Sequence, residues 1–127
     1  MTDPEPEDGF WLHDLRIETV LDGRTPVCRH VEGEVFRMQG ETLIFEEGAR
    51  VSAYALAALL PLLPAKQRMT DPQDWMSTDA EVACPDPHCG GRFRIVREGK
   101  RLFRHAETTG LPAARGTPYW QRSEEGA

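Results

Sequence analysis

The sequence has few cysteines, no long apolar run and no excess of basic residues, and each deficit excludes a class of protein. The 127-residue chain has three cysteines, Cys28, Cys84 and Cys89, an odd number that does not fit a disulfide framework. No apolar run approaches the ~20 residues that cross a bilayer, so no membrane contact is expected. A formal charge of −6 argues against a general nucleic-acid binder, which needs a basic surface.

Common enzyme signatures are also missing. The chain contains no glycine-rich phosphate loop, no Gly-x-Ser-x-Gly elbow and no His-Glu-x-x-His motif. This absence favours a non-enzymatic role over catalysis, and the sequence assigns no catalytic residue.

The two ends of the chain differ in composition from its middle. Residues 1–9 are acidic and contain prolines, and residues 106–127 are rich in Gly, Pro, Thr and charge, so both are expected to be flexible tails. A single domain is expected at residues 10–105. The N-terminal residues lack the basic and then apolar pattern of a signal peptide, so we expect a cytoplasmic protein with reduced thiols.

Short strands are predicted on both sides of one helix. Residues 11–20 alternate like a half-buried strand, and residues 35–38 and 42–45 read as a hairpin. Residues 81–84 and 92–96 are further short strands. With no alternating β-α units, the pattern indicates the α+β class, with antiparallel or mixed strands.

The helix candidate covers residues 52–65, which are rich in Ala and Leu. Ser52 is the expected N-cap, and Pro61 should end or kink the helix. Because nearly every side is apolar, the helix is expected to be buried, with the strands packed on it. Trp75 and Met76 are expected to pin the loop that follows onto the core.

The segment CPDPHCGG, residues 84–91, is the motif with the most chemical potential. Cys84 and Cys89 have the close spacing of half a zinc or iron site, and thiolates are ligands that both metals accept. The candidate ligands are Cys84, Cys89, His88 and Cys28. A thiol nucleophile at Cys84 or Cys89 is another interpretation.

The second half of such a metal site is missing from the local sequence. No second closely spaced cysteine pair exists, so Cys28 with His30, or His88 or His105, would have to converge on the loop. That gap favours a rigid structural loop over a metal site, with Cys84 buried as a small hydrophobe.

Residues 92–104 concentrate positive charge in an acidic protein. A turn at Glu98-Gly99 would make this run a hairpin, with Phe93 and Ile95 facing the core. Such a run can attract an anion or an acidic partner, although a solvated sheet face is the commoner outcome. The candidate residues are Arg92, Arg94, Arg97, Lys100, Arg101 and Arg104.

Three strings in the sequence carry a family resemblance. Residues 53–68 (AYALAALLPLLPAKQR), 74–76 (DWM) and 81–87 (EVACPDP) resemble a family of small uncharacterised prokaryotic proteins with a late Cys-Pro-Asp-Pro motif. That family often has Cys-Pro where this chain has Thr25-Pro26, and a cysteine near Val51-Ser52. The resemblance implies a fold and a core, with no reaction to carry over.

The sequence therefore predicts a small cytoplasmic binding or accessory protein that works with a protein partner, such as a small subunit of a larger enzyme complex. The alternative is a metal- or thiol-dependent small enzyme, or a zinc- or iron-binding module, centred on the CPDPHC loop. A second alternative is a homo-oligomeric structural protein that uses exposed Trp11, Trp75 or Tyr119-Trp120 as contacts.

Overall fold

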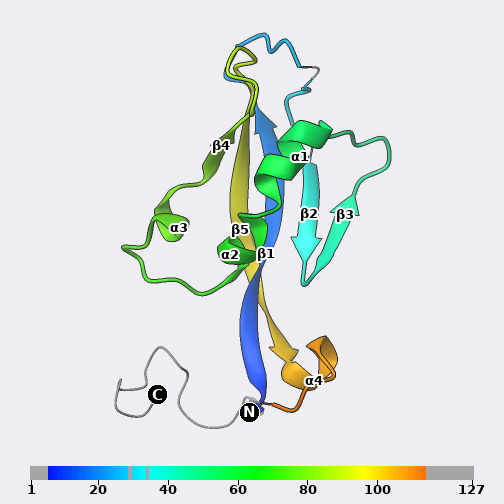
Figure 1. Ribbon diagram of the computed structural model, residues 1–127, viewed down its shortest axis with the longest axis vertical. Coiled ribbons are helices and arrows are strands. Elements are labelled where there is room, and N and C mark those ends of the chain that lie inside the picture. The colour runs from blue at the N-terminus through cyan, green and yellow to red at the C-terminus, as the bar shows by residue number, and fades with distance from the viewer. Residues whose placement is uncertain (1–5, 29, 34, 114–127) are drawn as a thin grey trace. The chain divides into compact units, whose positions relative to one another are not determined.

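The structure is a computed structural model that describes residues 6–28, 30–33 and 35–113 (Figure 1). Within these residues the five strands are β1 (Gly9–Val20), β2 (Val35–Gln39), β3 (Thr42–Phe45), β4 (Glu81–Ala83) and β5 (Arg92–Arg104). The four helices of the same residues are α1 (Ala53–Leu59), α2 (Leu63–Gln67), α3 (Trp75–Thr78) and α4 (His105–Thr108). The α+β class is confirmed.

The strands form one antiparallel sheet in the order β3-β2-β1-β5-β4. Leu15 of β1 faces Met38 of β2, and Val82 of β4 faces Phe93 of β5. β1 and β5 are neighbours that run in opposite directions through the middle of the sheet (Figure 1). The predicted hairpin is confirmed as β2 and β3.

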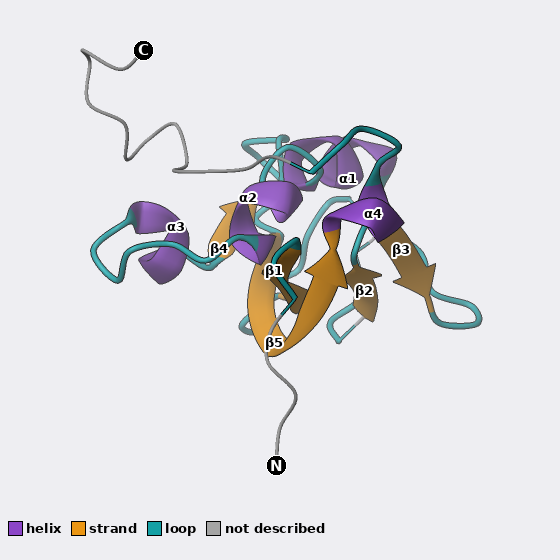
Figure 2. Cartoon of the chain, turned by 90° about the horizontal axis from the view of Figure 1, so that it is seen from below, coloured by secondary structure: helices purple, strands orange, loops and turns teal. Residues whose placement is uncertain are grey.

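Alternating side chains of the central strands build the core. Leu15 and Ile17 of β1 are 0 % and 1 % exposed, and Phe93 and Ile95 of β5 are each 3 % exposed. These residues face the core as the alternation predicted, because successive side chains of a strand point to opposite faces. Figure 2 shows α1 and α2 on one side of the sheet.

The expectation of one helix buried on nearly every side is not confirmed. The side chain of Ser52 accepts a hydrogen bond from the backbone N–H of Ala55 at 3.5 Å, as the predicted N-cap. Ala55 and Leu59 are buried, but Tyr54 is 78 % exposed. α2 then starts as a separate helix with Pro64 in its first turn, where proline is tolerated. Ala and Leu favour a helix wherever they lie on its surface, so their distribution does not show which face is buried. In the structure only one face of α1 packs against the sheet.

A lysine, and not an aromatic contact, holds the segment after α2. Trp75 is 64 % exposed, which contradicts its predicted packing on the core. Lys66 is 4 % exposed, and its Nζ donates hydrogen bonds to the carbonyl oxygens of Met76 at 2.7 Å and of Asp79. A charged donor satisfies these backbone carbonyls more strongly than a neutral one, so Lys66 can replace an apolar anchor.

The predicted turn at Glu98-Gly99 is wrong, because β5 is one continuous strand of 13 residues. The backbone of Gly99 does not enter the positive-φ region that tight hairpin turns require. Past this point Lys100 lies 5.9 Å from the ring centroid of Trp11, and Arg101 lies 2.8 Å from Asp14. β1 is long enough to lie beside β5 beyond Gly99, so β5 continues as a strand past this glycine.

The described residues divide into two compact units, one within residues 11–101 and one formed by residues 6–10 and 102–113. The first unit contains most of the sheet, α1, α2 and α3. In the second unit the rings of Phe10 and Phe103 stack with their centroids 5.9 Å apart.

The predicted tails are described in part. Residues 1–5 and 114–127, including Tyr119-Trp120, lie outside the described residues. Asp8 lies 3.1 Å from the Nε of Arg104. In the described part of the chain, no helix has the length and apolar character to span a membrane.

The buried face of α1 gives a test of the packing. Leu59→Ala should lower the free energy of unfolding by about 2–5 kcal/mol, because it removes a fully buried side chain. Tyr54→Ala on the exposed face should change it by no more than about 0.5 kcal/mol. Urea denaturation followed by circular dichroism measures both. Equal losses would mean that α1 is buried on both faces.

Candidate metal centre

Two loops that are distant in the sequence lie at the same end of the sheet. Residues 21–33 follow β1, and residues 84–91 join β4 to β5. Because β1 and β5 are antiparallel neighbours, the end of β1 lies beside the start of β5. Figure 1 shows the two loops together at that end.

Hydrogen bonds within the CPDPHCGG loop hold its conformation. The side chain of Asp86 accepts a hydrogen bond from the backbone N–H of His88 at 2.9 Å, an Asx turn. The carbonyl of Asp86 accepts from the N–H of Cys89, and the N–H of Cys84 donates to the carbonyl of Gly91 at 2.9 Å. The loop closes on itself, and Cys84 and Cys89 are 7 % and 3 % exposed.

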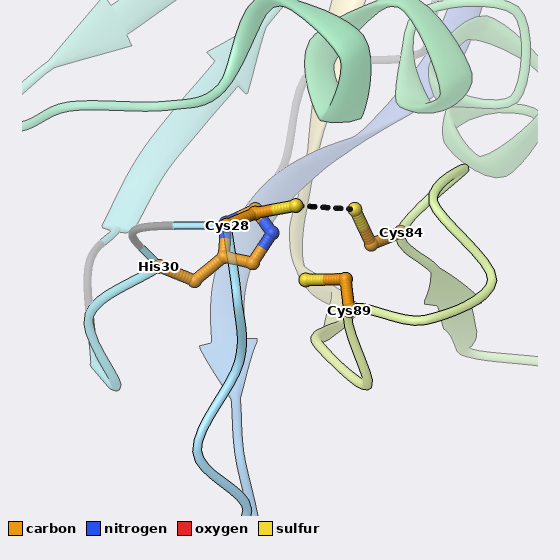
Figure 3. Close-up of side chains that lie close together, drawn as sticks. All are labelled: Cys28, His30, Cys84 and Cys89. Carbon is orange, nitrogen blue, oxygen red and sulfur yellow. Dashed lines mark hydrogen bonds between the residues drawn. The ribbon is translucent and has the colours of Figure 1, made fainter.

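Cys28 and His30 from the first loop meet Cys84 and Cys89 from the second (Figure 3). We call these four residues the Cys3His group. Their ligand atoms, three Sγ atoms and one imidazole nitrogen, all lie within 4.8 Å of one another. Figure 3 shows the three sulfur atoms directed towards a common space.

The spacing of the group fits a tetrahedral metal ion. An ion with Zn–S bonds of about 2.3 Å separates two of its sulfur ligands by about 3.8 Å. The Sγ atoms of Cys28 and Cys84 are 3.8 Å apart. The widest separation in the group exceeds the tetrahedral spacing by at most about 1 Å for two sulfurs and by at most about 1.3 Å for a sulfur and a nitrogen. Small side-chain rotations would therefore complete the coordination sphere.

Gly91 leaves the room that the His30 imidazole occupies. A Cβ at this position would lie 2.5 Å from Cδ2 and 3.1 Å from Nε2 of His30. The ring meets Phe93 edge-on, with centroids 5.0 Å apart. Its Nε2 atom is buried and has no hydrogen-bond partner among the described residues, which is costly for a polar atom unless a ligand such as a metal ion binds it.

Hydrogen bonds and burial shift the pKa values of two of the three thiols in opposite directions. Hydrogen bonding to Cys89, burial and hydrogen bonding to Cys84 together raise the pKa of Cys28 to about 12. Burial alone would raise the pKa of Cys89, but hydrogen bonds from Cys28 and from the backbone N–H of Gly91 outweigh it and lower that pKa. The Cys28 thiol thus keeps its proton and donates a hydrogen bond to the sulfur of Cys89. A divalent cation would replace such protons, because thiolates are the metal-binding form.

The structure brings together three of the four predicted metal ligands. Cys28, Cys84 and Cys89 belong to the Cys3His group, whereas His88 is exposed and is not a member. The fourth member is His30, which the sequence indicates, with Cys28, as one of the histidines that could complete the set. The Cys-x-His spacing of Cys28 and His30 is the sequence signal that points to it, but that signal is short and common.

The basic residues of β5 do not form an unpaired positive surface. Arg94 lies 3.4 Å from Glu81 of β4, and Arg97 donates to the backbone carbonyl of Lys66 at 2.7 Å. Acids on neighbouring segments thus offset much of this charge. The other contacts are Arg92 with Glu81, Arg101 with Asp14, Arg104 with Asp8 and Lys100 over the ring of Trp11. A role for these six residues in binding an anion or a partner stays a prediction.

Comparison with protein-family models, curated proteins and solved structures found no match to this chain. The family resemblance of residues 53–68, 74–76 and 81–87 therefore stays a prediction. The same holds for a protein partner and for homo-oligomer contacts through Trp11 and Trp75, which are 39 % and 64 % exposed.

Gly91 and Gly99 form a matched pair of test positions. Gly91→Ala should displace His30 from Phe93 and lower the free energy of unfolding by about 1–3 kcal/mol, because the added methyl overlaps the imidazole. Gly99→Ala meets no atom within 4 Å and should leave His30 in place. The measurement is the nuclear Overhauser effect between the His30 and Phe93 rings, together with urea denaturation. A retained His30–Phe93 signal in Gly91→Ala would show that Gly91 does not create this space.

Proposed function

We propose that this chain is a metal-binding structural module that holds one Zn²⁺ ion in its Cys3His group. The observation that carries the proposal is the convergence of four ligand atoms within 4.8 Å from two separate loops. This is the zinc- or iron-binding alternative of the sequence reading, with His30 in place of His88. Zinc is favoured over iron because one imidazole and three thiolates match a common structural zinc set.

The donor set supports a structural rather than a catalytic centre. Structural zinc sites are tetrahedral and filled by four protein ligands, whereas catalytic ones keep a position for water or substrate. Here four side chains supply all four donors, and Cys84 and Cys89 are buried. An ion held this way has no vacant position for a substrate. The proposal therefore agrees with the non-enzymatic role that the sequence favours.

The bound ion would fasten two parts of the chain that no disulfide connects. Cys28 and Cys84 are 56 residues apart in the sequence and are free thiols. An ion that connects the two loops closes a long loop of the chain, which has an entropic cost. The free energy of metal binding adds to the stability of the folded state, because the unfolded chain has no preformed site. Zinc would thus fix the loops at the end of β1 and at the start of β5.

The wider role that we propose for the module is binding or accessory. Val27 and Val31 flank the ligands of the first loop and are 75 % and 46 % exposed. Apolar side chains on an ordered loop are suitable contact points for another protein. Metal binding would hold them in place.

Metal content distinguishes His30 from His88. The protein, purified under reducing conditions and loaded with Zn²⁺, should retain about one ion per chain, since one Cys3His group supplies a full tetrahedral set. His30→Ala should weaken zinc affinity at least about 100-fold, because it removes a ligand. His88→Ala should not change it, because His88 is exposed outside the group. Competition with a chromophoric chelator measures both affinities.

Cysteine variants complete this test. Cys28→Ser, Cys84→Ser and Cys89→Ser should each lose zinc and also lower the midpoint of thermal unfolding of the zinc-loaded protein. A site centred on the CPDPHC loop alone would instead tolerate Cys28→Ser and His30→Ala and fail with His88→Ala. That pattern, or the absence of retained zinc, would refute the proposal.

A further inference from the structure

A second feature with binding chemistry lies away from the Cys3His group, at the open edge of β5. β4 pairs with β5 only up to Arg94, because β4 has three residues. Beyond that point the segment from α2 to Ala80 passes beside β5, and Ala80 accepts a hydrogen bond from the N–H of Ile95 at 2.8 Å. A pocket lies between them, lined in part by Lys66, Met76, Arg94, Val96 and Arg97.

The lining of this pocket is unusual in charge. Its residues include three cations, Lys66, Arg94 and Arg97, and no aspartate or glutamate. Apolar side chains of Met76 and Val96 line the remainder. Glu81 pairs with Arg94 from outside this lining, so the positive potential of the pocket comes mainly from Lys66 and Arg97.

Lys66 is the deepest of these cations. It is 4 % exposed, and its ammonium donates to two backbone carbonyls, which leaves one of its three N–H groups with no acceptor among the described residues. Burial lowers the pKa of Lys66, the nearby charge of Arg97 lowers it further, and Asp79 and Asp74 oppose this shift. A buried ammonium beside another cation is stabilised by an anion.

Arg97 also donates its hydrogen bonds to neutral oxygens. Its Nε donates to the carbonyl of Lys66 at 2.7 Å, and its Nη2 donates to the carbonyl of Arg68 at 3.2 Å and the hydroxyl of Thr70 at 3.0 Å. These acceptors are neutral oxygens, so they satisfy hydrogen bonds without neutralising the guanidinium. Arg94, which also lines the pocket, is paired with Glu81 at 3.4 Å. Two cations that line the pocket thus have no carboxylate among these acceptors.

We propose that this pocket binds a small organic carboxylate, with its headgroup at Lys66, Arg94 and Arg97 and its short aliphatic end against Met76 and Val96. A carboxylate matches the guanidinium and ammonium donors, which form their strongest hydrogen bonds with anions. The apolar part of the lining favours an aliphatic carboxylate over a bare inorganic anion. The proposal does not depend on zinc in the Cys3His group.

The test is a titration of the ¹⁵N-labelled full chain, with and without Zn²⁺, followed by two-dimensional NMR. Sodium propionate should give saturable shifts with a millimolar dissociation constant at the backbone amides of Lys66, Met76 and residues 94–97. Propionamide, which has the same shape without charge, and sodium chloride at equal ionic strength should not. Shifts that are absent, unsaturable or equal with propionamide would overturn the proposal.

Two arginines on β5 provide a matched pair of variants. Arg94→Gln should weaken propionate binding at least about threefold, because it removes a charged donor from the pocket. Arg101→Gln should leave the affinity within about twofold, because Arg101 is outside the lining. Both side chains are about half exposed and each is ion-paired with a single acid on a neighbouring strand, so both variants should fold. Equal effects of the two variants would mean that propionate senses only the overall charge, which would refute the site.

Discussion

The antiparallel pairing of β1 with β5 at the centre of the sheet is the constraint on which the rest of the structure depends. It places the end of β1 beside the start of β5, so the loops that carry Cys28 and Cys84 meet although 56 residues separate them. The same pairing buries Leu15, Ile17, Phe93 and Ile95 in one core cluster. Cys84 and Cys89 belong to that cluster as well, so the metal site that we propose is an extension of the core.

Much of the sheet could be predicted from local patterns. Alternation identified the buried faces of β1 and β5, and the two short runs at residues 35–38 and 42–45 identified the β2–β3 hairpin, because these patterns are local properties of the sequence. The continuity of β5 could not be predicted, since it depends on β1 being long enough to accompany it. The single exposed face of α1 also depended on tertiary structure, because an Ala/Leu-rich helix has no polar side that marks the solvent.

The candidate site was half visible in the sequence. Cys84 and Cys89 lie close together along the chain, and their spacing indicates a metal loop. The other half depends on strand order, because the pairing of β1 with β5 brings the loop that carries His30 to the CPDPHCGG loop. His88 is adjacent in sequence to Cys89 but is exposed. The charge of residues 92–104 was misleading for a similar reason. Acids that offset it, such as Glu81 and Asp14, come from neighbouring strands.

The central claim is that one zinc ion is held by three sulfurs and one imidazole nitrogen from the two loops. X-ray absorption spectroscopy of the zinc-loaded protein tests it most directly. We expect about three Zn–S distances near 2.3 Å and about one Zn–N distance near 2.0–2.1 Å. A first shell dominated by oxygen or nitrogen, with fewer than about two sulfurs, would contradict the account, because the Cys3His group supplies three.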